Sequence, residues 1–598
     1  MIASAVVILA VGLIAYMWSA RGFLSAFLHM LCVIVAGAMA LAVWEPLGSY
    51  LLTTGEGGFL TDNAWAIALA VPFILALVIT RVALDKIVPA NVHFSTPLNM
   101  LGGGVCGLVA GILTVGLALI TVGYTRLGPD LGFGYRPVTF DNGSLRRTGK
   151  LIFPADSITS AFYSSLSNGA FRPIGGDSLA KWHPEWWEEG TLLRTNFDDG
   201  QARNAYGPND FEVVGYYLYA PKNAGELFTD GFQKTAQKYA YLDGKSAADL
   251  NATEMMGVIV KFKAGAKEKS GRVVVGPAQI RLLVQTDPND SSSIIPVQPA
   301  AMVSQADASK NALGRWRFDA KDTFIASVGG RDDAPMAFEF PAPKGAIPIA
   351  VYVKGARVDF PTEGTNEPGP KRLKTFSSQS ERDDAIRSGG IFSGGGSVGK
   401  LDRSGAVTVK LDGNTTPDYL IRADASLPTG VVLAKDGLKD LTINDANAIN
   451  GGELSKFDPK DMENRGVDLN LAVRKFATTD DTVIVQLIVD RTNTRFGLLS
   501  EAAAAADKNK GPLLIDNNGA PYSPAGFYYK DAKETWIYFN PQSPITTLSG
   551  SLMPTISLSK PEQHLTLIFR VSKGVKITSF AIGDKVIAEF KPALDTIH

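Results

Sequence analysis

The sequence predicts a multi-domain membrane protein: a four-helix transmembrane domain, then a mixed α/β connector, then two mainly antiparallel β-sandwich modules of immunoglobulin-like type. Two observations carry this prediction. The first 125 or so residues are almost uncharged and contain four long apolar segments, whereas short runs rich in Val, Ile and Phe, broken by Gly, Pro, Asn and Asp, follow residue 255. A chain of 598 residues is also too long for a single hydrophobic core.

The four apolar segments cover residues 2–18, 23–44, 64–84 and 97–124. Each is close to the roughly 20 residues that a helix needs to cross the hydrocarbon layer of a membrane. The first has no basic region before it and a second span follows at once, so we expect a retained helix rather than a cleaved signal peptide. Aromatic residues sit near the predicted ends, as in the aromatic belts of membrane proteins: Tyr16, Trp18, Trp44, Trp65 and Tyr124.

The short loops predict the orientation. Arg21 lies between the first two spans, and Arg81 and Lys86 lie between the last two, whereas residues 45–63 hold three acids and no basic residue. Basic loops face the cytoplasm, so both termini are expected outside it. We therefore expect a multi-pass protein of the bacterial inner (cytoplasmic) membrane, with everything after Tyr124 on the extracytoplasmic side.

The last span contains glycines at a spacing of four, Gly103, Gly107 and Gly111. Such spacing exposes one backbone face on which another helix can pack closely. The partner helix can belong to the same domain or to another protein, and the sequence leaves both open. His29 and Asn99 are the polar candidates for a role inside the membrane, although His29 lies near a helix end and can also reach the headgroups.

Two motifs in this region resemble the colicin V production protein family. They are ARGF at residues 20–23 and the glycine-rich stretch LNMLGGGVCGLVAG at 98–111, and the resemblance covers about residues 1–125. It implies a small four-span inner-membrane domain associated with toxin production or export and with envelope integrity, and it implies no catalytic residue. The family often has an acid–base pair before the glycines and an arginine among them, where this chain has Asn99 and Ala110.

The remaining chain is divided by composition. We expect a mixed connector over residues 126–254, a first β-sandwich over 255–362, a flexible linker rich in Gly, Ser, Pro and charge over 363–404, and a second β-sandwich over 405–598. The membrane domain is then residues 1–125.

The two sandwiches resemble each other in sequence. Ala337–Phe360 and Leu567–Phe590 both read as a strand, a Lys-Gly turn and a final strand pair. At a constant offset, Phe340, Lys344 and Gly345 align with Phe569, Lys573 and Gly574. We therefore hypothesise that one module arose by duplication of the other.

Trp182, Trp186 and Trp187 form an aromatic cluster in the connector. They can form a platform for a ligand such as a sugar ring, rest at the membrane interface, or close a small core. His183 lies among Glu185, Glu188 and Glu189, but no second His and no Cys is near, so no metal site is expected.

Several functional classes are disfavoured. Three of the 58 basic and four of the 59 acidic residues precede Arg126, so the rest of the chain is balanced in charge and no nucleic-acid partner is expected. The chain has five His and two Cys, little material for a zinc site or a Ser-His-Asp triad. GGGSVGK at residues 394–400 imitates a phosphate loop but lacks the Ser or Thr after the lysine and a following helix.

These observations favour a non-enzymatic, membrane-anchored cell-envelope protein with no catalytic residue, metal or cofactor. Its expected partners are the lipid bilayer and other envelope or membrane proteins, among them a second copy of itself. Two alternatives remain open: a transport or export component, and an extracytoplasmic carbohydrate-binding module or hydrolase.

Overall fold

The structure is a computed structural model. It describes residues 2–54, 58–88, 94–126, 135, 138–141, 144–147, 151–171, 177–195, 202–229, 252–268, 271–287, 290, 293–308, 312–318, 324–327, 331, 333–362, 365, 367–392, 401–411, 420–422, 441–443, 448–452, 455–457, 475–476, 481–489, 510–548, 552–554 and 563–596. The GGGSVGK motif at 394–400 lies outside these residues.

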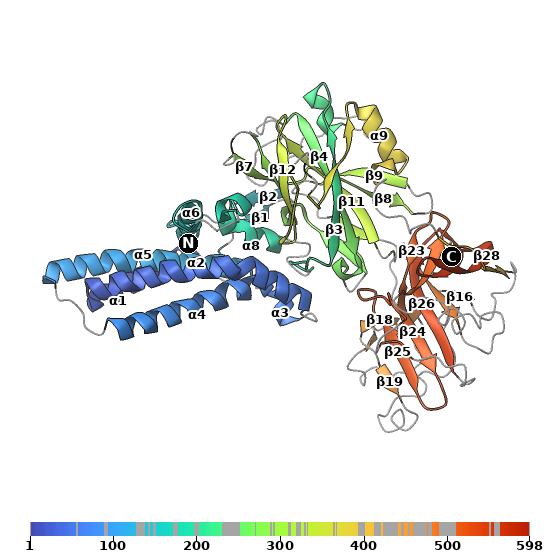
Figure 1. Ribbon diagram of the computed structural model, residues 1–598, viewed down its shortest axis with the longest axis horizontal. Helices are drawn as coiled ribbons and strands as arrows, with labels where there is room; N and C mark the ends of the chain where they lie inside the picture. The colour runs from blue at the N-terminus through green and yellow to red at the C-terminus, as the bar shows by residue number, and fades with distance from the viewer. Residues whose placement is uncertain are drawn as a thin grey trace.

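Four helices near the N-terminus are long and apolar enough to cross a membrane, as predicted. They form an elongated bundle at one end of the molecule (Figure 1), and their bounds are Ile2–Arg21 (α1), Phe23–Thr54 (α2), Ala64–Ile87 (α4) and Thr96–Gly123 (α5). A short helix, α3 (Phe59–Asp62), precedes α4. α2 continues beyond the predicted end at residue 44, because Leu47, Leu51 and Leu52 still pack on the bundle after the single acid Glu45.

The connector contains a small hairpin and three helices. Their bounds are Val138–Asp141 (β1), Ser144–Arg147 (β2), Ala155–Asn168 (α6), Leu179–Trp182 (α7) and Trp186–Arg194 (α8). α6 and α8 both contact α5, so the connector is packed on the helical bundle rather than extended away from it.

The first β-rich module, called module 1, is built from two sheets (Figure 1). The larger sheet has the order β14-β3-β4-β11-β8-β9 and the smaller has the order β13-β12-β6-β7. The bounds are Phe211–Tyr219 (β3), Glu254–Lys263 (β4), Ile280–Gln285 (β6), Ile294–Val297 (β7), Ala301–Asp307 (β8), Ala312–Arg317 (β9), Asp333–Ala342 (β11), Ile347–Val353 (β12), Ala356–Asp359 (β13) and Lys371–Phe376 (β14). A separate pair joins β5 (Arg272–Val275) to β10 (Phe324–Ser327).

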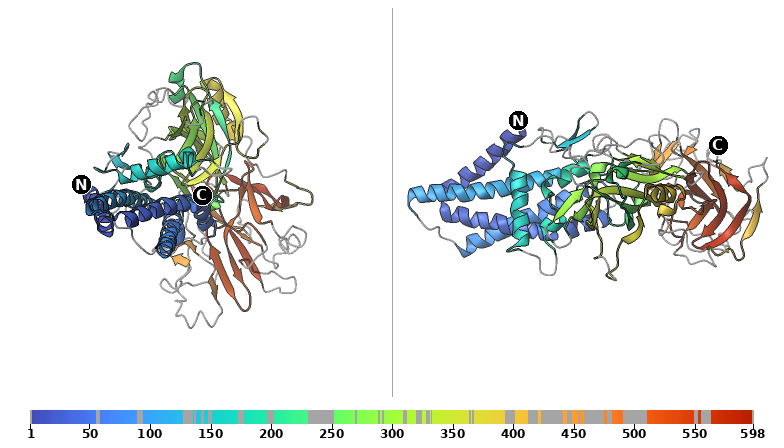
Figure 2. Two further views of the ribbon diagram at one scale, coloured as in Figure 1. Left: turned by 60° about the vertical axis from the view of Figure 1, so that its left-hand side comes forward. Right: turned by 90° about the horizontal axis from the view of Figure 1, so that it is seen from above.

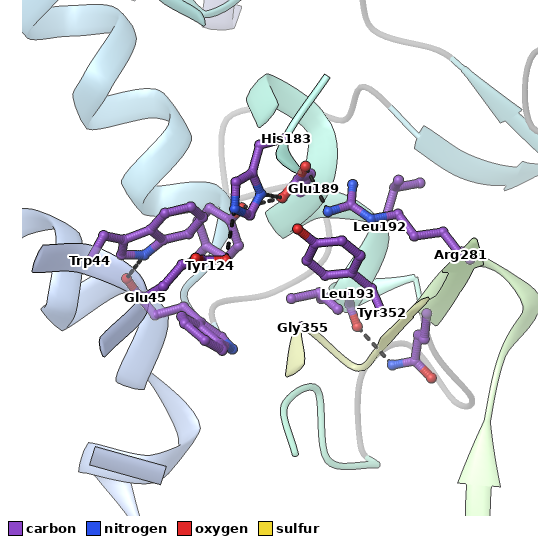
Figure 3. Close-up of a pocket in the computed structure, with 13 residues that line it drawn as sticks. Trp44, Glu45, Tyr124, His183, Glu189, Leu192, Leu193, Arg281, Tyr352 and Gly355 are labelled. Carbon is purple, nitrogen blue, oxygen red and sulfur yellow. Dashed lines mark hydrogen bonds and ion pairs between the residues drawn. The ribbon is translucent and has the colours of Figure 1, made fainter. Parts of the chain in front are cut away.

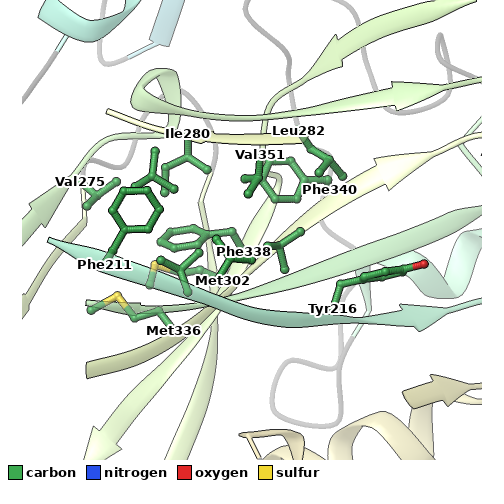
Figure 4. Close-up of a cluster of buried hydrophobic side chains, with 14 of the residues drawn as sticks. Phe211, Tyr216, Val275, Ile280, Leu282, Met302, Met336, Phe338, Phe340 and Val351 are labelled. Carbon is green, nitrogen blue, oxygen red and sulfur yellow. The ribbon is translucent and has the colours of Figure 1, made fainter. Parts of the chain in front are cut away.

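Module 1 is wider than the expected boundaries at 255 and 362. β3 comes from the expected connector and pairs with β4, and β14 comes from the expected linker and pairs in parallel with β3. α9 (Gln379–Arg387) follows β14, so part of the linker is regular structure. The core lies between the two sheets, where Phe338, Phe340, Leu282 and Val351 are fully buried (Figure 4).

Module 2 also has two packed sheets, ordered β15-β28-β27-β22-β23 and β16-β21-β26-β24-β25-β19. The bounds are Val407–Lys410 (β15), Leu420–Arg422 (β16), Ser455–Phe457 (β19), Thr482–Ile488 (β21), Pro512–Asp516 (β22), Pro521–Tyr522 (β23), Pro524–Lys530 (β24), Thr535–Phe539 (β25), His564–Ser572 (β26), Lys576–Ile582 (β27) and Lys585–Asp595 (β28). A small third sheet joins β17 (Leu441–Ile443), β18 (Ala448–Gly452) and β20 (Lys475–Phe476).

The two modules share one strand order, which agrees with the duplication hypothesis. In chain order, the nine strands β3, β4, β6, β7, β8, β9, β11, β12 and β13 correspond to β16, β21, β22, β23, β24, β25, β26, β27 and β28. Every neighbouring pair in the first set has an antiparallel counterpart in the second. The aligned motifs coincide with the step from one sheet to the other: Phe340 and Phe569 are buried in the larger sheets, and Gly345 (φ +74°) and Gly574 (φ +85°) make the turn that follows.

Candidate functional site

The candidate site lies where module 1 and the connector meet the end of the helical bundle (Figure 3). Five charged side chains from four parts of the chain converge there. We call them the junction network: Glu45 on α2, His183 and Glu189 around α8, Arg281 on β6 and Arg357 on β13.

His183 is the centre of the junction network. Its Nε2 lies 3.0 Å from Oε1 of Glu45, and its Nδ1 lies 2.7 Å from Oε2 of Glu189. A carboxylate only accepts hydrogen bonds, so both ring nitrogens carry a proton when both contacts are made. Burial lowers the pKa of His183, but the two carboxylates outweigh burial and raise it above 6.5.

Two arginines bring the network to three cations against two carboxylates, and Asp359 supplies a third carboxylate 2.9 Å from Nε of Arg357. Nη2 of Arg281 lies 2.7 Å from Oε1 of Glu189, and Nη1 of Arg357 lies 2.9 Å from Oε2 of Glu45. Burial raises the pKa of Glu189, but Arg281 and His183 outweigh it and bring that pKa to about 2. Glu189 is therefore charged at neutral pH, and its buried charge is compensated by Arg281 and His183.

Aromatic rings enclose the network. The ring centroid of Trp44 lies 5.0 Å from that of His183 and 5.8 Å from that of Trp186. Tyr124, the residue after α5, donates from its hydroxyl to Glu189 over 3.2 Å, and Tyr352 stacks under the guanidinium of Arg281 at 4.2 Å. These rings bury His183, Glu189 and Arg281 and strengthen their ion pairs by lowering the local dielectric, whereas Glu45 and Arg357 stay partly exposed.

A tight turn of module 1 rests on the bundle beside the network. The turn between β12 and β13 places Gly355 at φ +86°, and a Cβ there would lie 2.7 Å from Nε1 of Trp65 on α4. Only glycine combines this backbone conformation with so close an approach. The module and the bundle thus meet through packed side chains as well as ion pairs.

The space left at the junction is small. The cavity bordered by Glu45, His183, Glu189 and Tyr352 measures about 20 Å³, which is room for about one water molecule. An organic substrate does not fit into a space of this size. Among the described residues, no group of three or more His, Cys, Asp and Glu side chains is placed to hold a metal ion.

The predicted tryptophan cluster contributes to this joint but does not form one exposed platform. Trp186 is fully buried against Trp44. Trp182 is half-buried, with the guanidinium of Arg357 at 4.3 Å from its ring, and Trp187 packs at the edge of the helical core. Of the interpretations offered for this cluster, the position of Trp186 is that of a residue that closes a core.

The three predicted glycines pack against α1 of the same chain. A Cβ on Gly103, Gly107 or Gly111 would lie about 3 Å from backbone atoms of α1. Helix α1 of the same bundle therefore packs on the exposed backbone face of α5.

The two polar candidates have structural contacts. Asn99 accepts from the backbone N–H of Phe23 over 3.3 Å and donates to the carbonyl of Phe94 over 3.0 Å, so it ties the start of α5 to the start of α2. His29 stacks on Trp18 with a centroid separation of 4.0 Å. Neither residue lies at the junction network.

Sequence reasoning missed Glu45, Arg281, Tyr352 and Arg357, and it considered His183 and Glu189 only as metal ligands. The contact of Glu45 with Arg357 joins residues 312 positions apart. The one local signal was Glu45 itself, an acid directly after an apolar span.

Comparisons with known proteins add little. No protein-family model matches the chain, and no curated protein matches it. The crystal structure of vicilin from Corylus avellana (hazelnut) is similar at 8% identity over 53% of this chain and 74% of that chain, with a TM-score of 0.07. A TM-score of this size carries no argument about fold or function.

The raised pKa of His183 makes the joint sensitive to pH. A histidine whose pKa is raised by folding stabilises the folded state fully below its unfolded value of 6.5, and this contribution is lost as pH rises through the folded value. We expect the Tm of the full-length protein in detergent to fall more between pH 6.5 and 9 than that of His183→Gln, as followed by intrinsic fluorescence.

Lys354, buried in the same module, acts in the opposite sense. Burial lowers its pKa to about 7, so its contribution to stability rises with pH. It is present in both proteins, so it cancels in the comparison of the wild type with His183→Gln. Parallel curves for the two proteins would contradict the role given to His183.

Proposed function

We propose that this protein is a non-enzymatic, membrane-anchored protein of the bacterial cell envelope. The four helices anchor it in the inner membrane, and the two β modules bind partner proteins on the extracytoplasmic side. The observation that carries this proposal is the junction network, which fixes module 1 to the end of the bundle and leaves no room for a substrate.

The topology of the joint supports this arrangement. Glu45 is at the far end of the second apolar segment and Tyr124 is at the end of the fourth, and both contact the junction network. An even number of spans brings these two ends to one side of a membrane. The basic residues Arg21, Arg81 and Lys86 belong to the opposite end, which favours an extracytoplasmic location for the modules.

The strand order supports an immunoglobulin-like assignment for both modules. In module 1 the first, second, seventh and fifth strands lie side by side, as strands A, B, E and D do in immunoglobulin domains. The ninth, eighth, third and fourth strands form the other sheet, in the manner of G, F, C and C′. Each module has one additional strand next to the fifth: β9 beside β8 in module 1, and β25 beside β24 in module 2.

The sheet edges are the proposed binding surfaces. Among the described residues beyond 171, the exposed large apolar side chains are Trp316, Leu373 and Val407, with exposed fractions of 40%, 38% and 47%. They lie on β9, β14 and β15, and each of these strands is at the edge of its sheet. An exposed edge strand can pair with a strand of a partner, and apolar side chains on it add affinity.

A photo-cross-linking amino acid at position 316, 373 or 407 tests this function in cells. We expect discrete covalent adducts of defined mass from these edge positions, because a strand-pairing partner places its backbone within contact distance. Lys573, exposed in the turn after β26, is the matched control position. Adducts that are absent at the edges, or equally strong at 573, would contradict the proposed binding surfaces.

The resemblance of residues 1–125 to the colicin V production family adds a proposed setting. The family resemblance implies a role in toxin export or in maintaining the integrity of the envelope. In this proposal the helical domain is the anchor and the modules carry the recognition.

A further inference from the structure

Helix α6 lies across the helical bundle, nearly perpendicular to it, about halfway along its length (Figure 2, right). Two hydrogen bonds hold it there. Thr159 donates from Oγ1 to the carbonyl of Ile112 over 3.1 Å, and Tyr163 donates from its hydroxyl to the carbonyl of Val33 over 3.0 Å. α6 therefore contacts the interior of both α5 and α2, not their ends.

The fit beneath α6 is close. A Cβ on Gly116 of α5 would lie 2.1 Å from Oγ1 of Thr159, and a Cβ on Gly37 of α2 would lie 1.9 Å from the hydroxyl oxygen of Tyr163. Because Gly116 and Gly37 have no side chain, they leave the space into which α6 packs; we call this space the seat of α6. Such a seat indicates a fixed position for α6 on the bundle.

The contacts of α6 are deep within the bundle. Val33 lies twelve residues before Glu45 on α2, and Ile112 lies twelve residues before Tyr124, the residue after α5; Glu45 and Tyr124 both contact the junction network. At 1.5 Å per residue this is about 18 Å, and the hydrocarbon layer of a bilayer is about 30 Å thick. If α2 and α5 cross the layer up to the junction, α6 lies within it, and the residues just before α6 are level with the start of α1, where the N–H of Ile152 donates to Oγ of Ser4 over 3.2 Å.

The surface of α6 suits an apolar medium. Residues 151–171 contain one charged residue, Asp156, which is 3% exposed and accepts a hydrogen bond from Tyr135. Toward the outside the segment presents Ile152, Ile158 and Phe171, with exposed fractions of 76%, 39% and 45%, together with the uncharged polar residues Ser165 and Asn168. A surface helix in water normally carries charge on this face.

Four of the seven hydroxyl side chains of α6 donate to carbonyl groups within the protein. Ser157 donates to the carbonyl of Pro154 over 3.2 Å, and Ser167 donates to that of Ser164 over 2.7 Å. Together with Thr159 and Tyr163, they place their hydroxyl protons on protein acceptors rather than on water. This is the requirement for polar groups inside the hydrocarbon layer.

A location of α6 at the membrane surface is less consistent with the bundle. In that case the half of the bundle between α6 and the junction would stand in water. This half exposes Met39, Val43 and Val71, with exposed fractions of 51%, 44% and 45%. Apolar side chains continue outward on both sides of α6, so the lipid-facing surface is continuous across it.

We propose that α6 is an intramembrane helix that lies in the plane of the bilayer and contacts lipid acyl chains through Ile152, Ile158, Ala161 and Phe171. The proposal rests on the membrane anchoring proposed above. It adds a fifth membrane element, drawn from the connector that follows the four spans. The lipid-contacting segment is residues 151–171, and charge returns in the sequence with Arg172.

Site-directed fluorescence tests this location. In a Cys32→Ala, Cys106→Ala background, Ala161→Cys carries a polarity-sensitive label in the full-length protein, reconstituted in phosphatidylcholine vesicles. Bromine atoms are placed either at the middle of the acyl chains or near the headgroups. We expect mid-chain bromine to quench the label at 161 more strongly than shallow bromine, and aqueous iodide to quench it little.

Two further positions make the outcomes separable. Met39→Cys on α2 reports the lipid-facing side of a span. Asp177→Cys reports a water-exposed position just beyond the segment. If label 39 is quenched by mid-chain bromine while label 161 behaves like label 177, or is quenched best by shallow bromine, the α6 proposal is overturned alone. If label 39 is not quenched either, membrane anchoring fails and the α6 proposal fails with it.

Discussion

Replacing Glu189 with alanine is expected to destabilise the junction between the bundle and module 1 by about 3–5 kcal/mol. The change leaves the Arg281 guanidinium and the His183 imidazolium buried without their shared carboxylate, at former distances of 2.7 Å each. It also removes the acceptor of the Tyr124 hydroxyl. A buried charge without a counter-charge is among the most costly defects in a folded protein.

Thermal unfolding of the full-length protein in mild detergent measures this effect. For a unit of roughly 200 residues, 1 kcal/mol corresponds to a shift in Tm of about 2–4 °C, so Glu189→Ala is expected to lower the transition of module 1 by at least about 6 °C. Glu212→Ala is the matched control, since Glu212 is an exposed acid on β3 of the same module.

The control is expected to stay within about 0.5 kcal/mol of the wild type. Equal shifts for Glu189→Ala and Glu212→Ala would show that the junction network adds nothing to stability beyond an ordinary surface charge. Glu189→Gln is expected to fall between the two, because the amide keeps the volume and can still accept one hydrogen bond but carries no charge.

The helices could be predicted from the sequence because their signal is local. A run of about 20 apolar residues has few alternatives to a spanning helix, and all four predicted spans correspond to long apolar helices. The end of α2 was placed too early, because Glu45 interrupts the apolar run although the helix continues to Thr54. Glu45 interrupts the apolar run because its carboxylate pairs with His183 and Arg357, which lie far along the chain.

The strands were predictable in proportion to their burial. β4 and β11 are central, and their apolar runs are conspicuous. β14, with the sequence KRLKTF, pairs at a sheet edge and exposes most of its side chains, so its composition is that of a linker. An edge strand owes its conformation to its neighbour, which explains why the first module extends beyond the boundaries drawn from composition.

The junction network could not be predicted, because its contacts carry no local pattern. His183 meets Glu45 across 138 positions, and Arg357 meets it across 312. The histidine and acids of the WHPEWWEEG stretch were visible, but without a second histidine or a cysteine nearby they predicted no metal site. Only the fold shows that arginines from β6 and β13 neutralise the carboxylates instead.

Replacing Gly107 with leucine is expected to have the largest effect in the helical bundle. A Cβ at this position would lie 2.8 Å from Cβ of Trp18 and 3.0 Å from both Cα and the carbonyl oxygen of Ala15. Backbone atoms cannot move aside as a flexible side chain can, so α1 must separate from α5. Overpacking of this kind typically costs about 1–3 kcal/mol and more when a helix is displaced.

Gly12→Leu is the matched control, because a Cβ on Gly12 of α1 meets nothing within 4 Å. Both variants gain up to about 1 kcal/mol of helix propensity, so their difference isolates the clash. In mild detergent, Gly107→Leu is expected to lower the unfolding temperature of the bundle or to abolish monodisperse protein, while the transition of module 2 stays in place. Because the glycine face receives α1 of the same chain, this loss should not depend on protein concentration. If Gly107→Leu instead melted like Gly12→Leu, α1 would not be seated on this face, and the glycines would be free to receive a helix from another protein.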